Sequence, residues 1–379
     1  MYNPTFEHSV KKYRDFYNMK PGAPIYMTEF GFYSMERWVR EGHMKKDTPW
    51  TEMREMWGWD HGVRFGLSNL GWVTAGFNPL FEVKVIESVG EDWEHVQDEV
   101  GRITKCFKDR RNGFMPEYVD HPVKDMRTWE ELCKWRMDPT TPSRVAEQDK
   151  YIEWALHNRE QKGQLIIANC VGGYMYLRSL MGPVELLYYT YDQPELIHDC
   201  MRTWFTLADT YYARAQKAGV NIDEVFFGED ICYNHGLLIS PDMVREFLFP
   251  YYQQLIGNIR SRQPDKTQPV KFQLDTDGWC EPAIPLYDEL GLDFMSPFEV
   301  ASNCDVVRIG QQYPNLLMTG GFDKRILAKG KDAIDREVDR ILPAMQKRGG
   351  YYPTSDHGVP EEVSFENYCH FRKRLLEFA

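Results

Sequence analysis

The sequence predicts an α/β protein built as a (β/α)₈ barrel. Two observations lead to this prediction: short apolar runs alternate with longer segments of helical period, and eight such runs occur along the 379 residues. Several runs carry consecutive apolar residues, which is typical of parallel strands buried on both faces. A doubly wound open sheet is the alternative. It usually has fewer strands and a glycine-rich first turn, and no G-x-G-x-x-G follows Phe30.

The eight predicted strands are all short apolar runs. They are Pro24–Phe30, Phe77–Ile86, Gln164–Cys170, Ile222–Phe227, Val270–Leu274, Leu292–Ser296, Asn315–Thr319 and Gly350–Pro353. Eight strands, each followed by a helix, make one barrel. We therefore interpret residues 1–379 as a single domain, in which residues 1–23 are an N-terminal extension.

The helices between the strands have recognisable boundaries. Pro194 opens a helix that Gly219 ends. Ser240 and Pro241 open another, because serine caps a helix well and proline fits its first turn. Pro250 should kink that second helix, since proline lacks the N–H that the helix ladder needs.

The pattern changes between Val89 and Met115, where apolar residues are spread among charged ones. Gly101 and the pair Asn112-Gly113 punctuate this stretch, and Asn-Gly is a strong turn signal. Residues 89–115 are therefore predicted to form a β-hairpin inserted into the second βα unit.

The charge and composition argue against two classes of binding partner, nucleic acids and membranes. The net charge of -12 argues against binding to nucleic-acid phosphates, and no apolar run approaches the length of a membrane span. The polar N-terminus does not resemble a signal peptide, and the eight scattered cysteines suit reduced thiols. We expect a cytoplasmic protein with a small-molecule substrate, and a homodimer on base rates alone.

Carboxylates gather at the predicted C-terminal strand ends, where barrel active sites lie. Six of the eight predicted ends carry at least one, among them Glu29, Glu229, Asp230, Asp275, Asp277, Glu299, Asp323 and Asp356. So many carboxylates cannot all stay charged and unpaired. A metal ion, a cationic substrate or an arginine partner would each relieve the repulsion.

Asp275, Asp277 and His357 are the candidate metal ligands. Residues two apart in an extended segment point to the same side, and His357 follows the last strand. Two carboxylates and an imidazole suit Zn²⁺, Fe²⁺ or Mn²⁺ with positions left open for substrate, and zinc is our first expectation. The alternative is that the aspartates cap a helix and the histidine bonds to backbone.

Other residues at the strand ends are candidates for catalysis and substrate binding. Glu229 and Asp230 could act as general acid and base, or could instead be partners of Arg178. The predicted substrate contacts are Glu29, Tyr33, Tyr174, Arg178 and Glu299.

Five segments in a specific order carry a family resemblance. They are FGEDICYNHGLLISPDMVREFLFPYY, TDG, GLDFMSPFE, TGGFDKRILAKG and SDHGVPEEVSFENY. With them the chain resembles the uroporphyrinogen decarboxylase-like superfamily, which includes cobalamin-dependent methyltransferases. The resemblance runs along nearly the whole chain and implies the same barrel.

The resemblance also bears on the metal site. Methyltransferases of this superfamily typically bind zinc through His-x-Cys after the fifth strand and a distant Cys after the eighth. Here Asp275, Asp277 and His357 take those three places. The resemblance thus implies a metal site, but not the sulfur-rich kind that suits thiol activation.

The function implied by the resemblance is a metal-assisted methyltransferase for a small O- or N-methylated substrate. Its methyl group would pass to or from a corrinoid on a separate protein, because no corrinoid-binding domain fits within this chain. One alternative is a decarboxylase or lyase for a different acid, with Arg37 or Arg178 facing the pocket. Uroporphyrinogen itself carries many carboxylates, which an anionic rim would repel. The other alternative is a non-catalytic barrel that binds a small ligand.

Overall fold

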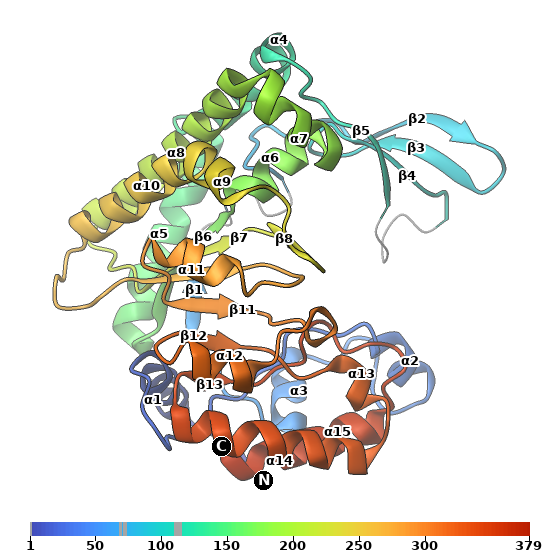
Figure 1. Ribbon diagram of the computed structural model, residues 1–379, viewed down its shortest axis with the longest axis vertical. Helices are drawn as coiled ribbons and strands as arrows, with labels where there is room; N and C mark the ends of the chain where they lie inside the picture. Colours follow the sequence, from blue (N-terminus) through green and yellow to red (C-terminus); the bar gives the residue numbers. More distant parts are fainter. Residues whose placement is uncertain (1, 68–69, 71–73, 110–115) are drawn as a thin grey trace.

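A seven-stranded, wholly parallel sheet forms the centre of the molecule (Figure 1). The computed structural model describes residues 2–67, 70, 74–109 and 116–379. The strands, in sheet order, are β1 (Arg64–Gly66), β6 (Leu165–Val171), β7 (Glu224–Gly228), β10 (Lys271–Asp275), β11 (Phe294–Ser296), β12 (Leu317–Thr319) and β13 (Tyr351–Tyr352). Spatial order follows chain order, as in a barrel. The six strands predicted between Gln164 and Pro353 are confirmed.

Helices connect successive strands of this sheet. The α-helices are α1 (Phe6–Tyr17), α2 (Met35–Arg40), α3 (Trp50–Trp57), α4 (Met126–Thr128), α5 (Pro142–Lys162), α6 (Gly173–Met181), α7 (Pro183–Asp192), α8 (Pro194–Lys217), α9 (Pro241–Phe247), α10 (Phe249–Arg262), α11 (Ala283–Asp288), α12 (Val306–Gln312), α13 (Lys324–Leu327), α14 (Lys331–Arg348) and α15 (Phe365–Leu375). None of the described helices is long and apolar enough to cross a membrane.

The predicted helix starts and the predicted kink are confirmed. The Ser240 hydroxyl accepts the Met243 N–H at 3.2 Å and so caps α9. The helix is divided at Leu248, and Pro250 lies in the first turn of α10, where its missing N–H costs no hydrogen bond.

Residues 24–30 form no regular strand, so the prediction of a first strand there is wrong. The backbone groups that a strand ladder would use are already paired. Asp60 Oδ2 accepts the Met27 N–H at 2.8 Å, the Asp60 N–H donates to the Met27 carbonyl at 2.8 Å, and the Ile25 N–H donates to the Phe378 carbonyl. The segment still contributes buried side chains to the core.

The strand predicted at 77–86 is also wrong. The strand that pairs with β6 in the parallel sheet is instead β1, which has only three residues and begins with arginine, so no apolar run marks it. The predicted segment contains Pro79, which has no N–H to donate within a central strand.

A separate antiparallel sheet projects from the body as an arm (Figure 1). Its strands are β2 (Lys84–Val89), β3 (Trp93–Gln97), β4 (Ile103–Phe107) and β5 (Glu117–Asp120). It is larger than the predicted hairpin at 89–115, within which β3 and β4 pair. The Asn112-Gly113 turn signal lies outside the described residues.

Candidate active site

The C-terminal ends of β7, β10 and β11 lie level with one another. Asp275 pairs with Gly228 on one side and with Ser296 on the other. The residues that follow these three strands therefore share one rim of the sheet. We call Asp230, Asp277 and Glu299 the acidic mouth.

The backbone of these loops fixes the acidic mouth. The Gly278 N–H donates to Glu299 Oε2 at 2.9 Å, and the Asp277 N–H lies 3.5 Å from Asp230 Oδ1. Asp230 has a φ of 43°, a left-handed conformation that is costly for a residue other than glycine. The carboxylates of Asp230 and Glu299, which follow β7 and β11, thus accept backbone N–H groups of the loop that follows β10.

Three neighbouring carboxylates repel the carboxylate of Asp277. Burial, followed by repulsion from Asp230, Glu299 and Asp275, raises the pKa of its carboxyl to about 7. Its side chain nonetheless remains 42% exposed, so it can meet a ligand. Burial also raises the pKa of Asp275 to about 6, although the Ser296 hydroxyl donates to this carboxylate.

His357 reaches the mouth from the loop after β13. Its Nε2 lies 3.9 Å from Asp277 Oδ2. Its Nδ1 accepts the Gly358 N–H at 2.8 Å, which assigns the proton of the neutral ring to Nε2. Burial and the charge of Lys324 lower the pKa of His357, so the ring is neutral at neutral pH.

Two exposed aromatic rings flank His357. The Phe30 ring centre lies 5.0 Å from the imidazole, and the Tyr33 ring stacks on it at 5.7 Å. These rings are 48% and 62% exposed. Aromatic surface therefore borders the carboxylates of the mouth.

The cations near the mouth are already paired. Arg178 donates to Asp230 Oδ2 at 3.2 Å, and Lys324 Nζ lies 3.3 Å from Glu299 Oε1. In the described part of the chain, no lysine or arginine lies at ion-pair distance from Asp275 or Asp277. The mouth therefore keeps an uncompensated negative charge whenever Asp277 is ionised.

Glu229, a predicted acid or base, is fully buried beneath the mouth. Its Oε1 accepts the Tyr287 hydroxyl at 2.9 Å, and its other oxygen accepts the Tyr252 hydroxyl. Burial raises its pKa to about 7. Glu229 can hold a proton there, but it presents no surface to a ligand in this structure.

Two predicted substrate contacts are also buried. Glu29 is 6% exposed, and its oxygens accept the Phe30 and Ser355 N–H groups and the Tyr368 hydroxyl. Tyr174 is 1% exposed. Both side chains pack inside the protein. Of the predicted substrate contacts, Tyr33, Arg178 and Glu299 remain at the mouth.

The predicted metal ligands are only partly brought together. Asp277 and His357 face each other, whereas Asp275 is engaged by the Ser296 hydroxyl. Across residues 2–67, 70, 74–109 and 116–379, no three His, Cys, Asp or Glu side chains form a group that could hold a metal ion. The donor set does not fit a metal as it stands, and the metal site stays a prediction.

Sequence reasoning missed Lys324 and the two tyrosines that hold Glu229. Lys324 follows the seventh predicted strand end within GGFDKR, so its position could have been found by extending that strand end by one residue. Tyr252 and Tyr287 lie on α10 and α11, and helical spacing alone marks them only as core residues.

Comparisons with known proteins agree with this fold. Residues 113–377, which are 265 of the 379 residues, match the family described as uroporphyrinogen decarboxylase (URO-D). A uroporphyrinogen decarboxylase of Campylobacter fetus is 27% identical over 187 residues, covering 49% of this chain and 50% of that protein. One of Pseudomonas entomophila is 25% identical over 191 residues, covering 50% of each. The chain spans about half the length of the curated relatives it matches.

A solved structure has a similar fold along the whole chain. A methyltransferase from Methanosarcina mazei superposes with a TM-score of 0.61 and covers 99% of both chains at 14% identity. The family match over most of the chain carries the assignment, and the structural likeness supports the fold. The chain belongs to the uroporphyrinogen decarboxylase (URO-D) family.

Proposed function

We propose that the chain is a methyltransferase that takes a small, cationic, N-methylated substrate at the acidic mouth. The methyl group would pass to a corrinoid on a separate protein. The observation that carries this proposal is the half-exposed Asp277 carboxylate, which forms no ion pair with a described lysine or arginine and which faces His357, the ring that the exposed Phe30 and Tyr33 contact.

A methylated ammonium group fits this surface chemically. Its charge would relieve the repulsion that raises the pKa of Asp277. It offers few or no N–H donors, so it is recognised by carboxylate charge and by aromatic faces. The exposed rings of Phe30 and Tyr33, which contact His357, supply such faces.

The chain's own residues would bind and orient the substrate in this reaction. The bond between nitrogen and the methyl carbon breaks with its electron pair left on nitrogen, and the methyl carbon bonds to the nucleophilic acceptor. The corrinoid, when bound, supplies that acceptor. The ionised carboxylates of Asp277 and Asp230 hold the cation in position, and the free amine product takes its proton from solvent.

A binding experiment with two probes of the same shape tests the substrate class. Choline carries a quaternary nitrogen, and 3,3-dimethylbutan-1-ol replaces that nitrogen by carbon and is neutral. Calorimetry should show binding of choline only, and Asp277→Asn should lose it. Glu281→Gln is the matched control, because Glu281 pairs with Arg308 outside the mouth. Equal binding of the two probes would refute the cationic substrate.

Methyl transfer itself is then measured with reduced cobalamin as acceptor. Formation of methylcobalamin from an N-methylated amine should require the protein and should fall with Asp277→Asn. If N-methylated amines bind but none of them transfers its methyl group, the protein only binds such ligands. The enzymatic part of the proposal would then be wrong.

The predicted zinc is tested separately, because a quaternary nitrogen has no lone pair for a metal to hold. Asp277 and His357 are the two predicted ligands that face each other, and no third His, Cys, Asp or Glu of the described residues completes a group with them. Elemental analysis of the wild type beside His357→Ala decides this. Near-stoichiometric metal that the variant loses would favour the O-methyl substrate over the cationic one.

A decarboxylase is the second candidate, favoured by the family match and the names of the relatives. Arg178 is the cation at the mouth that could hold an acid, whereas Arg37 bonds to Glu41 and to the Glu361 carbonyl away from it. This candidate predicts release of carbon dioxide without cobalamin and its loss in Arg178→Ala. Small carboxylic acids are the first to assay, because the acidic mouth would repel the many carboxylates of uroporphyrinogen.

A further inference from the structure

Two buried cysteines lie in contact between the loops that follow β10 and β11. The sulfur atoms of Cys280 and Cys304 are 3.5 Å apart, and neither residue is exposed. Cys304 Sγ also lies 3.4 Å from the carbonyl oxygen of Gly278. The proposed reaction uses neither thiol.

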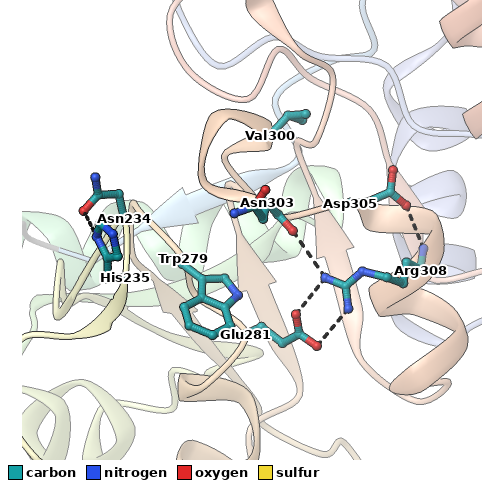
Figure 2. A pocket seen from close by; sticks show the side chains of 8 residues that line it. All are labelled: Asn234, His235, Trp279, Glu281, Val300, Asn303, Asp305 and Arg308. Atoms are coloured by element: carbon teal, nitrogen blue, oxygen red, sulfur yellow. Dashed lines mark hydrogen bonds and ion pairs between the residues drawn. The ribbon is translucent and has the colours of Figure 1, made fainter.

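A surface pocket of about 720 Å³ lies between the same two loops (Figure 2). Its wall includes the chain neighbours of both cysteines: Trp279 and Glu281 on one side, Asn303 and Asp305 on the other. Each cysteine is therefore one residue along the chain from residues that line the pocket.

The pocket is held open by charged contacts between the same two loops. Arg308 donates to both oxygens of Glu281, at 2.9 and 2.7 Å, and to the Asn303 carbonyl (Figure 2). Arg308 lies on α12 and through these bonds joins the loop that carries Cys280 to the loop that carries Cys304.

We infer that Cys280 and Cys304 form a peroxide-sensitive dithiol that closes to a disulfide. The inference rests on the contact between the two sulfur atoms and on the pocket beside them, and it is independent of the proposed function. The sulfur atoms must approach from 3.5 Å to about 2.0 Å, a shift that small changes in side-chain rotation and in the two loops can supply.

The chemistry balances with hydrogen peroxide as the oxidant. The Cys304 thiolate attacks one peroxide oxygen, the O–O bond breaks, and sulfenic acid and hydroxide form. The Cys280 sulfur then attacks the sulfenic sulfur and expels water. Two electrons pass from the two thiols to one peroxide. The hydrogen bond with Cys280 lowers the pKa of Cys304, which favours Cys304 as the sulfur that reacts first.

Mass spectrometry of the folded full-length protein tests the pair. After treatment with peroxide, the mass of the wild-type protein should fall by the mass of two hydrogen atoms. Digestion should then yield the Cys280 peptide linked to the Cys304 peptide. Dithiothreitol should reverse both changes. In Cys280→Ala the disulfide cannot form, so Cys304 should instead be trapped as sulfenic acid and labelled by dimedone.

A neighbouring thiol supplies the control. Cys232 is buried near Cys304, and burial raises the pKa of its thiol. In the described part of the chain, however, it is the Cys280 sulfur that contacts the sulfur of Cys304. Cys232→Ala should leave the linked peptide unchanged. A linked peptide that contains Cys232, or unmodified Cys280 and Cys304 at a peroxide dose that oxidises exposed methionines, would overturn the inference.

Discussion

Asp277 and His357 face each other across the mouth, with Nε2 of the histidine 3.9 Å from Oδ2 of the aspartate, although they follow different strands. Burial and the charge of Lys324 lower the pKa of the imidazole and keep it neutral, so it does not compensate the carboxylate. The charge of the mouth near neutral pH is therefore set by whether Asp277 is protonated.

Choline binding should consequently depend on pH. The pKa of Asp277 is raised to about 7, so below that pH the carboxyl becomes neutral and loses its attraction for the cation. Affinity should fall up to about tenfold for each pH unit below the pKa and level off above it. Calorimetry from acidic to mildly basic pH measures this. A pH-independent affinity in the wild type would show that Asp277 does not bind the cation.

Glu229 should make the folded state less stable as pH rises. Its pKa is about 7 in the folded protein, against an ordinary value of 4.5, so the folded state binds the proton more tightly than the unfolded chain does. The resulting stability is fully present below pH 4.5 and is lost as pH rises through about 7. Relative to Glu229→Gln, the wild type should lose up to about 3 kcal/mol over that range. Urea unfolding at several pH values measures the difference, and parallel pH profiles would contradict it.

The sequence predicted where the site residues lie better than where they point. Glu229 and Asp230 are adjacent after β7, and the left-handed backbone of Asp230, with a φ of 43°, changes the direction of the chain between them. Glu229 accordingly turns toward Tyr252 and Tyr287 in the helix layer, while Asp230 turns to the mouth. Which of the two faces inward depends on the register of β7, which an apolar run does not reveal.

The fold could be predicted wherever a strand is a continuous apolar run. β6 (LIIANCV) is close to such a run, and its expected range differs from the observed one by one residue at each end. β10 (KFQLD) contains Lys271 and Gln273, and its expected range also differs by one residue. β1 has three residues, including Arg64, whose charge is satisfied inside the sheet by Glu224 at 2.9 Å. This ion pair, between the buried Glu224 and the partly exposed Arg64, is a tertiary contact, and local sequence contains no signal of it.

Asp60 should be essential for the stability with which the N-terminal segment packs. Its carboxylate accepts Lys12 Nζ at 2.8 Å, the Ser9 hydroxyl at 2.9 Å and the Met27 N–H at 2.8 Å, and Lys12 is only 2% exposed. Asp60→Asn leaves a buried ammonium without its counter-charge and should cost about 3–5 kcal/mol of unfolding free energy. Lys12→Met combined with Asp60→Asn should recover part of this loss. A double variant less stable than the single one would show that the ion pair is not the cause.

Gly172 should tolerate no side chain, because it packs against Glu229. A Cβ built at Gly172 would lie 1.7 Å from Glu229 Oε2 and 2.7 Å from the Glu229 Cα, so backbone as well as side chain would have to move. Gly172→Ala should therefore destabilise the fold by at least about 1–3 kcal/mol, as overpacking does. Gly257→Ala is the matched control: nothing lies within 4 Å of its Cβ position, and alanine in the middle of α10 should stabilise the fold by about 1 kcal/mol. Thermal or urea unfolding of the two variants measures the expected loss of stability in Gly172→Ala and the expected gain in Gly257→Ala. If Gly172→Ala were as stable as Gly257→Ala, the close contact between β6 and β7 beneath the mouth would not exist in solution.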